Sequence, residues 1–158
     1  MLKLIGEYEC KLDGKSRLLF PSALKKQIPT PDEELSFVLN RGFEPCLTLH
    51  TSEVWNSIIE DINNLDDYVE KHRELKRYFY NGAQILTLDS ANRLLLPKGL
   101  LEFAGIEKEI ILFAYSNKIE IWDTKKYKSL FTNVAANFSR LAEEVMSKKD
   151  KNNTNNVS

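Results

Sequence analysis

One ten-residue pattern occurs twice in the chain and constrains its fold more than any other feature of the sequence. The segment 12–21 reads LDGKSRLLFP and the segment 88–97 reads LDSANRLLLP, so six of the ten positions are identical. An apolar run and then an alternating apolar–polar segment follow each copy, at 35–39 and 47–50 in the first case and at 110–113 and 119–122 in the second. The chain is therefore a tandem duplication.

Each copy predicts a strand, a tight turn, a second strand and the start of a helix. Asp13 and Asp89 precede small residues that tolerate a left-handed backbone, and an Asp side chain hydrogen-bonds the backbone ahead of it in such turns. The Arg-Leu-Leu-apolar run that follows is typical of a short strand. Pro21 and Pro97 then suit the first turn of a helix. We interpret these two aspartates and two prolines as structural residues of the turns.

The pattern Asp-x-x-x-Arg-apolar-apolar-apolar-Pro resembles the signature of the SpoVT/AbrB-type swapped-hairpin DNA-binding domain. Two copies in one chain, separated by a helical insert, are similar to the MraZ transcriptional regulators, and the resemblance covers about residues 1–145. That family usually has Gly directly before the arginine, where this chain has Ser16 and Asn92. Asn accepts a positive φ readily and Ser does so with some strain, so we expect a slightly reshaped first turn.

The resemblance implies an α+β fold, a pseudo-two-fold swapped-hairpin β-barrel built from two tandem AbrB-like repeats with peripheral helices. We expect one barrel-plus-helices domain over residues 1–146. Its parts are repeat 1 at 7–52, a helical insert at 53–81, repeat 2 at 82–125 and a C-terminal helix at 126–146, and a disordered tail follows at 147–158. The tail is polar and cannot supply a core of its own.

Apolar residues at helical spacing predict three longer helices. The first begins at Thr51 or Ser52, the second covers 66–80, and the third runs from Asp123 to about Met146. The aromatic run 78–80 is open to two interpretations, a base-stacking platform or a contact with the core or another subunit. The acidic character of its helix favours the contact. The aromatic residues that exceed the needs of the barrel are Trp55, Tyr78, Phe79, Tyr80 and Tyr127.

Charge is distributed unevenly along the 158 residues, whose formal net charge is −1. Residues 1–30 carry +3 and residues 76–158 carry +4, whereas residues 31–75 carry −8. This segregation suits a protein with one face toward phosphate and another away from it, although ordinary scatter of solvated charge gives similar numbers. The sequence has no apolar run long enough for a membrane span and no signal-peptide segment, so we expect a cytoplasmic protein without a membrane partner.

Nothing in the sequence predicts a catalytic, metal or cofactor site. Cys46 and His50 lie close together, but the one other imidazole is His72 and no further ligands follow at a recognisable spacing. We interpret Cys10, Cys46 and His50 as structural, in keeping with a reducing compartment. We expect no enzymatic activity, no cofactor, no metal and no small-molecule substrate.

The resemblance implies that basic residues at the two turns bind DNA. Arg17 and Arg93 are the leading candidates. Lys15 strengthens the first turn because its counterpart Ala91 is uncharged. The alternative for each arginine is an internal salt bridge with the aspartate of its turn. Both roles are compatible, since a positioned guanidinium binds better than a mobile one.

Two further lysines extend this expected DNA-binding surface on the side of the first repeat. Lys11 lies near the end of the entry strand predicted at 4–12, and Lys3 precedes that strand. We expect both side chains to add contacts to phosphate.

The resemblance also implies a sequence-specific transcriptional repressor, associated with the nucleoid, that acts on the division and cell-wall gene cluster and on its own promoter. We expect a homo-oligomeric ring that reads direct repeats of double-stranded DNA, because a single subunit with so little net charge should bind phosphate weakly. The alternative is an AbrB-type antitoxin or another transition-state-type regulator of the same fold. An antitoxin should have one repeat and apolar anchors in its tail, where this chain has Val157 alone.

Overall fold

The computed structural model describes residues 2–132 and 134–155. The chain divides into two compact units with a boundary between Thr124 and Lys125, and each unit is described by itself. The first unit holds both repeats and the insert between them. The sequence predicts one domain over 1–146, whereas the structure assigns the C-terminal helices to a second unit.

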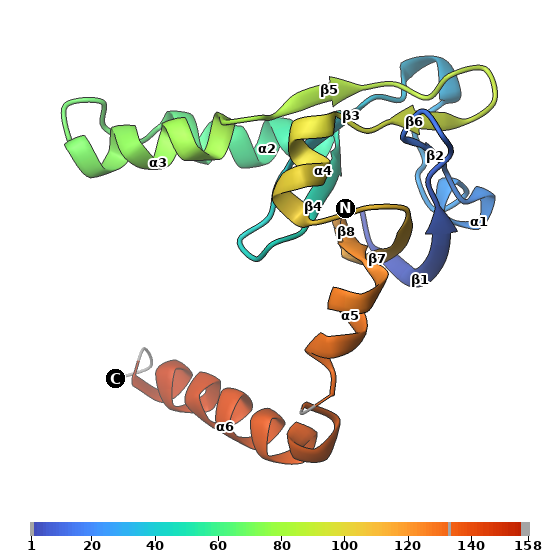
Figure 1. Cartoon of the computed structure of the whole chain (residues 1–158). Helices are drawn as coiled ribbons and strands as arrows, with labels where there is room; N and C mark the ends of the chain where they lie inside the picture. Colours follow the sequence, from blue (N-terminus) through green and yellow to red (C-terminus); the bar gives the residue numbers. More distant parts are fainter. Residues whose placement is uncertain (1, 133, 156–158) are drawn as a thin grey trace. The chain divides into compact units, whose positions relative to one another are not determined.

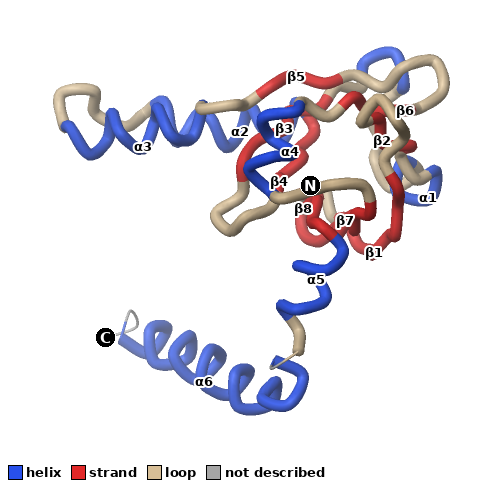
Figure 2. The backbone as a smooth tube through the Cα atoms, in the orientation of Figure 1, coloured by secondary structure: helices blue, strands red, loops and turns tan. Residues whose placement is uncertain are grey.

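The first unit contains two sheets, one with six strands and one with two (Figures 1 and 2). In spatial order the larger sheet consists of β1 (Leu4–Lys11), β7 (Glu109–Ser116), β8 (Lys118–Asp123), β4 (Leu47–Thr51), β3 (Phe37–Arg41) and β5 (Gln84–Leu86). The smaller sheet pairs β2 (Arg17–Leu19) with β6 (Arg93–Leu95). All of these pairings are antiparallel.

The strand order reads the same from both ends when each strand is exchanged for its counterpart in the other repeat. The entry strand of each repeat lies on the hairpin of the other, because β1 pairs with β7 and β5 pairs with β3. Two central ladders join equivalent strands directly. Leu18 faces Leu94 where β2 meets β6, and Thr48 faces Glu120 where β4 meets β8. The tandem duplication is thus one mixed α/β unit with interleaved halves.

The barrel that the resemblance implies does not close. Within the described residues β1 and β5 are the two edges of the larger sheet and form no ladder with each other. β5 has three residues against eight in β1, so it offers few hydrogen bonds for closure. The edge of β1 is also partly covered, because the Gln27 side chain accepts from Ile5 N at 3.0 Å and donates to Ile5 O at 2.8 Å. A side chain here takes the place of a neighbouring strand.

The apolar core draws on equivalent positions of both repeats. Each decamer contributes a leucine that is fully buried, Leu18 or Leu94, and each following helix contributes another. The paired hairpins add the rest of the common core, which includes Phe37, Leu39, Leu47, Leu49, Ile110, Leu112, Ile119 and Ile121. Burial of this apolar surface provides the main free energy of folding for such a unit.

Four α-helices accompany these sheets, together with the short 3-10 helix Asp32–Glu34. They are α1 (Ser22–Lys25), α2 (Ser52–Asn63), α3 (Glu70–Tyr80) and α4 (Lys98–Ala104). Pro21 and Pro97 occupy the N-cap positions of α1 and α4, one residue ahead of the expected first turn. Gly105 ends α4 in a left-handed conformation with φ 65°, as a C-terminal glycine does.

The insert is a pair of helices that extends away from the sheets (Figure 1). Thr51 caps α2 as predicted, since its hydroxyl accepts from Val54 N at 3.3 Å. α3 begins later than predicted, because the Asp66 carboxylate accepts the N–H of Tyr68 and holds these residues in a turn. Trp55 of α2 stacks on Phe79 of α3 with ring centroids 5.1 Å apart.

The second unit contains α6 (Val134–Asn155) and α5 (Thr124–Leu130) apart from its first residue, where the sequence predicts one helix that ends near Met146. The hydroxyls of Ser129 and Thr132 donate to backbone carbonyls of the preceding turn, which competes with helical bonding at the break. α6 then continues through the predicted tail to Asn155, since no Gly or Pro interrupts this stretch. Residues 156–158 of that tail lie outside the described residues.

A search of the described residues finds no helix with the length and apolar character needed to cross a bilayer.

Candidate nucleic-acid interface

The two Asp-x-x-x-Arg turns are built by the same set of hydrogen bonds. In the first turn, Oδ1 of Asp13 accepts the backbone N–H groups of Lys15 and Arg17, both at 2.9 Å. Its other oxygen, Oδ2, accepts from the Arg17 Nε at 2.7 Å. The equivalent three contacts of Asp89 in the second turn are all 2.9 Å long. Each aspartate thus fixes both the backbone of its turn and the guanidinium beside it.

These contacts favour the ionised form of both carboxylates. The pKa of Asp13 lies below its ordinary value, mainly because the backbone N–H of Arg17 donates to it, and the other donors of the turn add to this effect against desolvation. The pKa of Asp89 is lowered in the same way by Arg93. The arginine side chains remain 28% and 33% exposed. A guanidinium has five N–H donors, so each can hold its aspartate and still donate to an outside acceptor.

The residue before each arginine has a left-handed backbone, with φ 62° at Ser16 and 60° at Asn92. The expected reshaping of the first turn is therefore absent at this position. The two turns are also tied to each other by reciprocal backbone bonds. Phe20 N donates to Asn92 O at 2.9 Å, and Leu96 N donates to Ser16 O at 3.0 Å. This exchange explains why Ser16 adopts the same φ as Asn92, since the opposite strand fixes its carbonyl.

The pairing of β2 with β6 brings the two predicted arginines together. Arg17 lies opposite Leu95, and Arg93 lies opposite Leu19. The Arg93 Nη1 is 4.0 Å from Asp13 Oδ2, so the carboxylate of the first turn reaches both guanidinium groups. Two cations that are 76 residues apart in the sequence thus share one surface.

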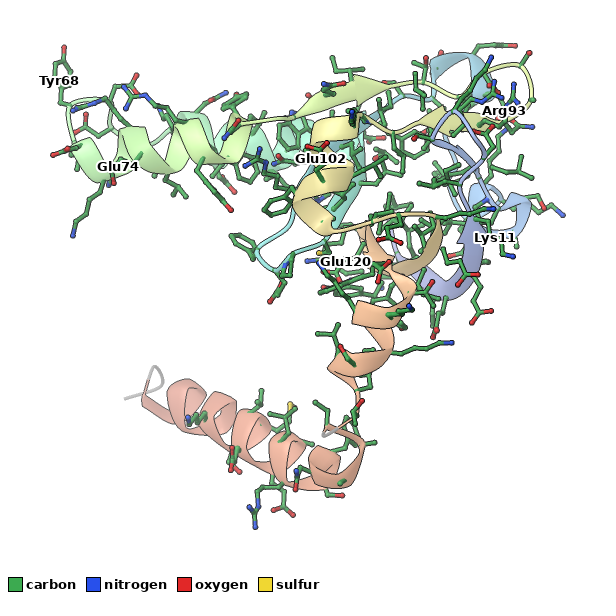
Figure 3. The ribbon with its side chains drawn as sticks, in the orientation of Figure 1. Lys11, Tyr68, Glu74, Arg93, Glu102 and Glu120 are labelled. Atoms are coloured by element: carbon green, nitrogen blue, oxygen red, sulfur yellow. The ribbon has the colours of Figure 1, made fainter. Side chains whose placement is uncertain are left out.

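The predicted lysines are placed less uniformly. Lys15 is exposed within the first turn. Lys11 ends β1 close to that turn, on the same side of the view as Arg93 in Figure 3, and its side chain is 70% exposed beside Glu109 at 3.9 Å. Lys3 precedes β1, at the end of the strand opposite to Lys11.

A second group of polar side chains lies where β4 meets β8. A carboxylate oxygen of Glu44, the Sγ of Cys46 and a carboxylate oxygen of Glu120 could each ligate a metal ion, and these atoms lie within 4.8 Å of one another. Burial, followed by the charges of the two glutamates, raises the pKa of the Cys46 thiol to about 12. The Glu120 carboxylate already accepts from the Tyr115 hydroxyl and the Trp122 Nε1. A protonated thiol and an engaged carboxylate make a poor ligand set.

Sequence reasoning did not connect Glu120 with Cys46. The register of β4 against β8, in which Thr48 faces Glu120, places these residues on one face of the sheet. Nothing in the local sequence encodes that register. His50 lies on β4 and is also buried, and burial together with the nearby Lys118 lowers its pKa to about 4.

The fold and the turns together define a class of protein, a tandem-repeat chain that presents two matched Asp-x-x-x-Arg turns side by side. A family described as "MraZ protein, putative antitoxin-like" matches this chain over residues 4–78 and again over residues 79–149. The chain belongs to the MraZ family.

Curated relatives are similar along nearly the whole chain. A protein of Christiangramia forsetii is 44% identical over 95% of this chain and 97% of its own length. One of Flavobacterium psychrophilum is 41% identical over 92% and 93%, and one of Cytophaga hutchinsonii is 34% identical over 89% and 93%. Each is named "Transcriptional regulator MraZ". These names describe regulators, which confirms the expectation that the family is not enzymatic.

Proposed function

We propose that this chain is a transcriptional regulator that binds double-stranded DNA through its two Asp-x-x-x-Arg turns. The carrying observation is the β2–β6 ladder, which puts Arg17 and Arg93 on one surface with both guanidinium groups partly exposed. Arg is suited to this task because its planar fork recognises phosphate or a guanine edge with paired hydrogen bonds. The names of the relatives support regulation as the outcome of binding.

The finer proposal follows from the family resemblance. The protein acts in the cytoplasm, on the nucleoid, as a repressor of the division and cell-wall gene cluster and of its own promoter. Lys15 and Lys11 add contacts on the side of the first turn, and Lys3 adds a contact to phosphate from the opposite end of β1. The interleaved strand pairing supports a swapped-hairpin arrangement of the repeats, with an open sheet in place of a closed barrel.

We further propose that the working form is a ring of subunits that reads direct repeats. The insert supplies exposed aromatic surface for subunit contacts, with Tyr68 at 96%, Tyr78 at 50% and Tyr80 at 44% exposure. Of the aromatic residues expected to contribute, Trp55 is buried and Phe79 is stacked on it, so these two stabilise the helix pair instead. Head-to-tail contacts repeat the same face in the same sense, which matches direct repeats about 10 base pairs apart.

Footprinting on DNA upstream of the gene tests the proposal. We expect protection of repeated short elements, and binding to three repeats at least tenfold tighter than binding to one, because linked weak sites multiply affinity. Sedimentation of the free protein should show an oligomer. Affinity for the upstream fragment no better than for random DNA contradicts sequence-specific regulation, and a monomer that binds one repeat as tightly as three contradicts the ring.

An antitoxin remains the second candidate, and one observation favours it. α6 exposes apolar side chains that a bound toxin could cover: Val134, Phe138, Leu141, Val145 and Met146. These side chains precede the predicted tail at 147–158, in which Val157 is the one apolar residue. Copurification of a stoichiometric toxin with the full chain, together with growth arrest when the toxin is expressed alone, would favour this function.

A further inference from the structure

One side chain links the helix of the first repeat to the turn of the second. Lys25, the last residue of α1, donates from Nζ to the Asn92 Oδ1 at 2.8 Å and to the Asp32 Oδ2 at 3.1 Å. The side chain of Lys25 is 21% exposed and that of Asp32 is 74% exposed, so this link lies at the surface of the unit. Asn92 is the left-handed residue directly before Arg93. The bond therefore reaches the point of the second turn that sets the direction of its arginine.

Among the residues that the structure describes, the first turn has no equivalent link. The repeat offset of 76 residues makes Leu101 the counterpart of Lys25 and Ser16 the counterpart of Asn92. Leu101 is apolar and buried at 6% exposure, so its side chain donates no hydrogen bond. Position 14 is also open, since a Cβ added to Gly14 would meet nothing within 4 Å. The two turns share their backbone geometry, but a lysine side chain from a neighbouring helix bonds the second turn and an apolar leucine takes its place at the first.

We propose that Lys25 is a positioning residue that acts through Asn92. Its bond fixes the conformation of the second turn, and with it the position of Arg93, before DNA binds, whereas the first turn changes its conformation on binding. This inference rests on the proposed DNA-binding function. Preorganisation raises affinity because ordering that is already complete need not occur on binding. Because the Lys25 ammonium already donates to an amide and a carboxylate, it is a poor direct contact for phosphate.

The test compares Lys25→Met, which keeps most of the aliphatic stem, with Lys26→Met, which removes an exposed charge from the neighbouring residue. Affinity for the upstream fragment is measured over a range of salt concentrations. We expect Lys25→Met to weaken binding about fivefold to twentyfold with an unchanged salt slope, and Lys25→Arg to restore it to within about threefold. A slope that falls by about 0.9 would make Lys25 a phosphate contact and overturn the proposal.

A double-mutant cycle tests the route through Asn92. Asn92→Gly keeps the left-handed backbone and removes the acceptor, so Lys25→Met should add little to it. Additive losses, or a loss from Lys25→Arg equal to that from Lys25→Met, contradict the proposal.

Amide hydrogen exchange supplies a readout that needs no DNA. In Lys25→Met the N–H groups of Ala91 and Arg93 should exchange faster, while those of Lys15 and Arg17 keep their rates. Unchanged exchange in the second turn overturns the link. If the wild-type protein does not bind DNA but Lys25→Met shows this selective change in exchange, the proposed function is contradicted and the Lys25–Asn92 link is retained.

Discussion

The two repeats match at the two central ladders and differ at the edges of the larger sheet and in the helices. Both turns have the same carboxylate bonds and nearly the same φ, and the central ladders join like with like. At the periphery β1 has eight residues against three in β5, and α4 has seven against four in α1. A change in a central ladder alters the contact between two equivalent strands. A change in an entry strand or helix alters a contact that its counterpart does not share to the same extent, and this freedom allows the two halves to specialise.

The largest expected effect tests equality at the centre. Leu18 and Leu94 are fully buried and face each other across the β2–β6 ladder. Leu18→Ala and Leu94→Ala should each lower the free energy of unfolding by about 2–5 kcal/mol, because each leaves a cavity in a packed core. The two losses should agree within about 1 kcal/mol if the halves are equivalent there. Denaturant titration of each variant measures this.

The neighbouring leucines provide matched controls. Leu19 and Leu95 are 62% and 59% exposed on the same two strands. Their replacement by Ala should change stability by less than about 0.5 kcal/mol, as surface substitutions usually do. Unequal losses at the buried pair, with small effects at the exposed pair, would show that the two repeats are not equivalent at the β2–β6 ladder.

The sequence predicts those central features well because the information is local. The decamers contain the turn, the strand and the start of the helix, and a search for repeats needs nothing else. Closure of the barrel could not be predicted, since it depends on β5 being short and on Gln27 bonding the edge of β1. The extent of α6 was missed because polar composition indicates disorder even where no residue breaks a helix.

The candidate site likewise contains residues that the sequence predicts and a residue that it does not. Arg17 and Arg93 follow from the repeated pattern, and the pairing of their strands brings them together. Lys3 was assigned by nearness in sequence to the first repeat, and its contact with phosphate stays a prediction. Lys25 was not identified, because its partner Asn92 is 67 residues away and the bond depends on tertiary structure.

The second prediction concerns a difference between the paired hairpins. His50 on β4 corresponds to Trp122 on β8, and both are buried, but the histidine alone titrates. Because its folded pKa is about 4 against an ordinary 6.5, the unfolded chain takes up a proton in this range that the folded chain does not. Stability should fall as pH drops from 6.5 toward 4, by up to about 1.4 kcal/mol per pH unit.

Denaturant titrations of His50→Gln at several pH values check this assignment. The variant should lose most of the slope between pH 6.5 and 4, whereas His72→Gln should keep it. A wild-type slope that survives in His50→Gln would place the titrating group elsewhere.

The third prediction concerns the relative weight of the two turns in DNA binding. Arg17→Ala should weaken specific binding more than Arg93→Ala, because Lys15 adds charge to the first turn and Ala91 adds none to the second. The loss for Arg17→Ala should be about 1–3 kcal/mol with relaxed specificity if it contacts a guanine edge. If it contacts phosphate, the salt slope should fall by about one. Equal affinity of wild type and Arg17→Ala at moderate salt removes this residue from the interface.

The smallest expected effect lies at the residue before each arginine. Ser16 and Asn92 both have φ near 60°, a region that costs most L-residues about 1–2 kcal/mol and Asn less. Ser16→Gly should therefore raise the free energy of unfolding by about 0.5–1 kcal/mol, since relief of this strain exceeds the entropy that Gly adds to the unfolded chain. Asn92→Gly should give no gain, because Asn is less strained there and its side chain accepts from Lys25 at 2.8 Å. Denaturant midpoints of the two variants measure the difference. Equal gains from both would show that the Lys25–Asn92 bond contributes no stability, and the outward asymmetry of the two turns would then reduce to the charge of Lys15.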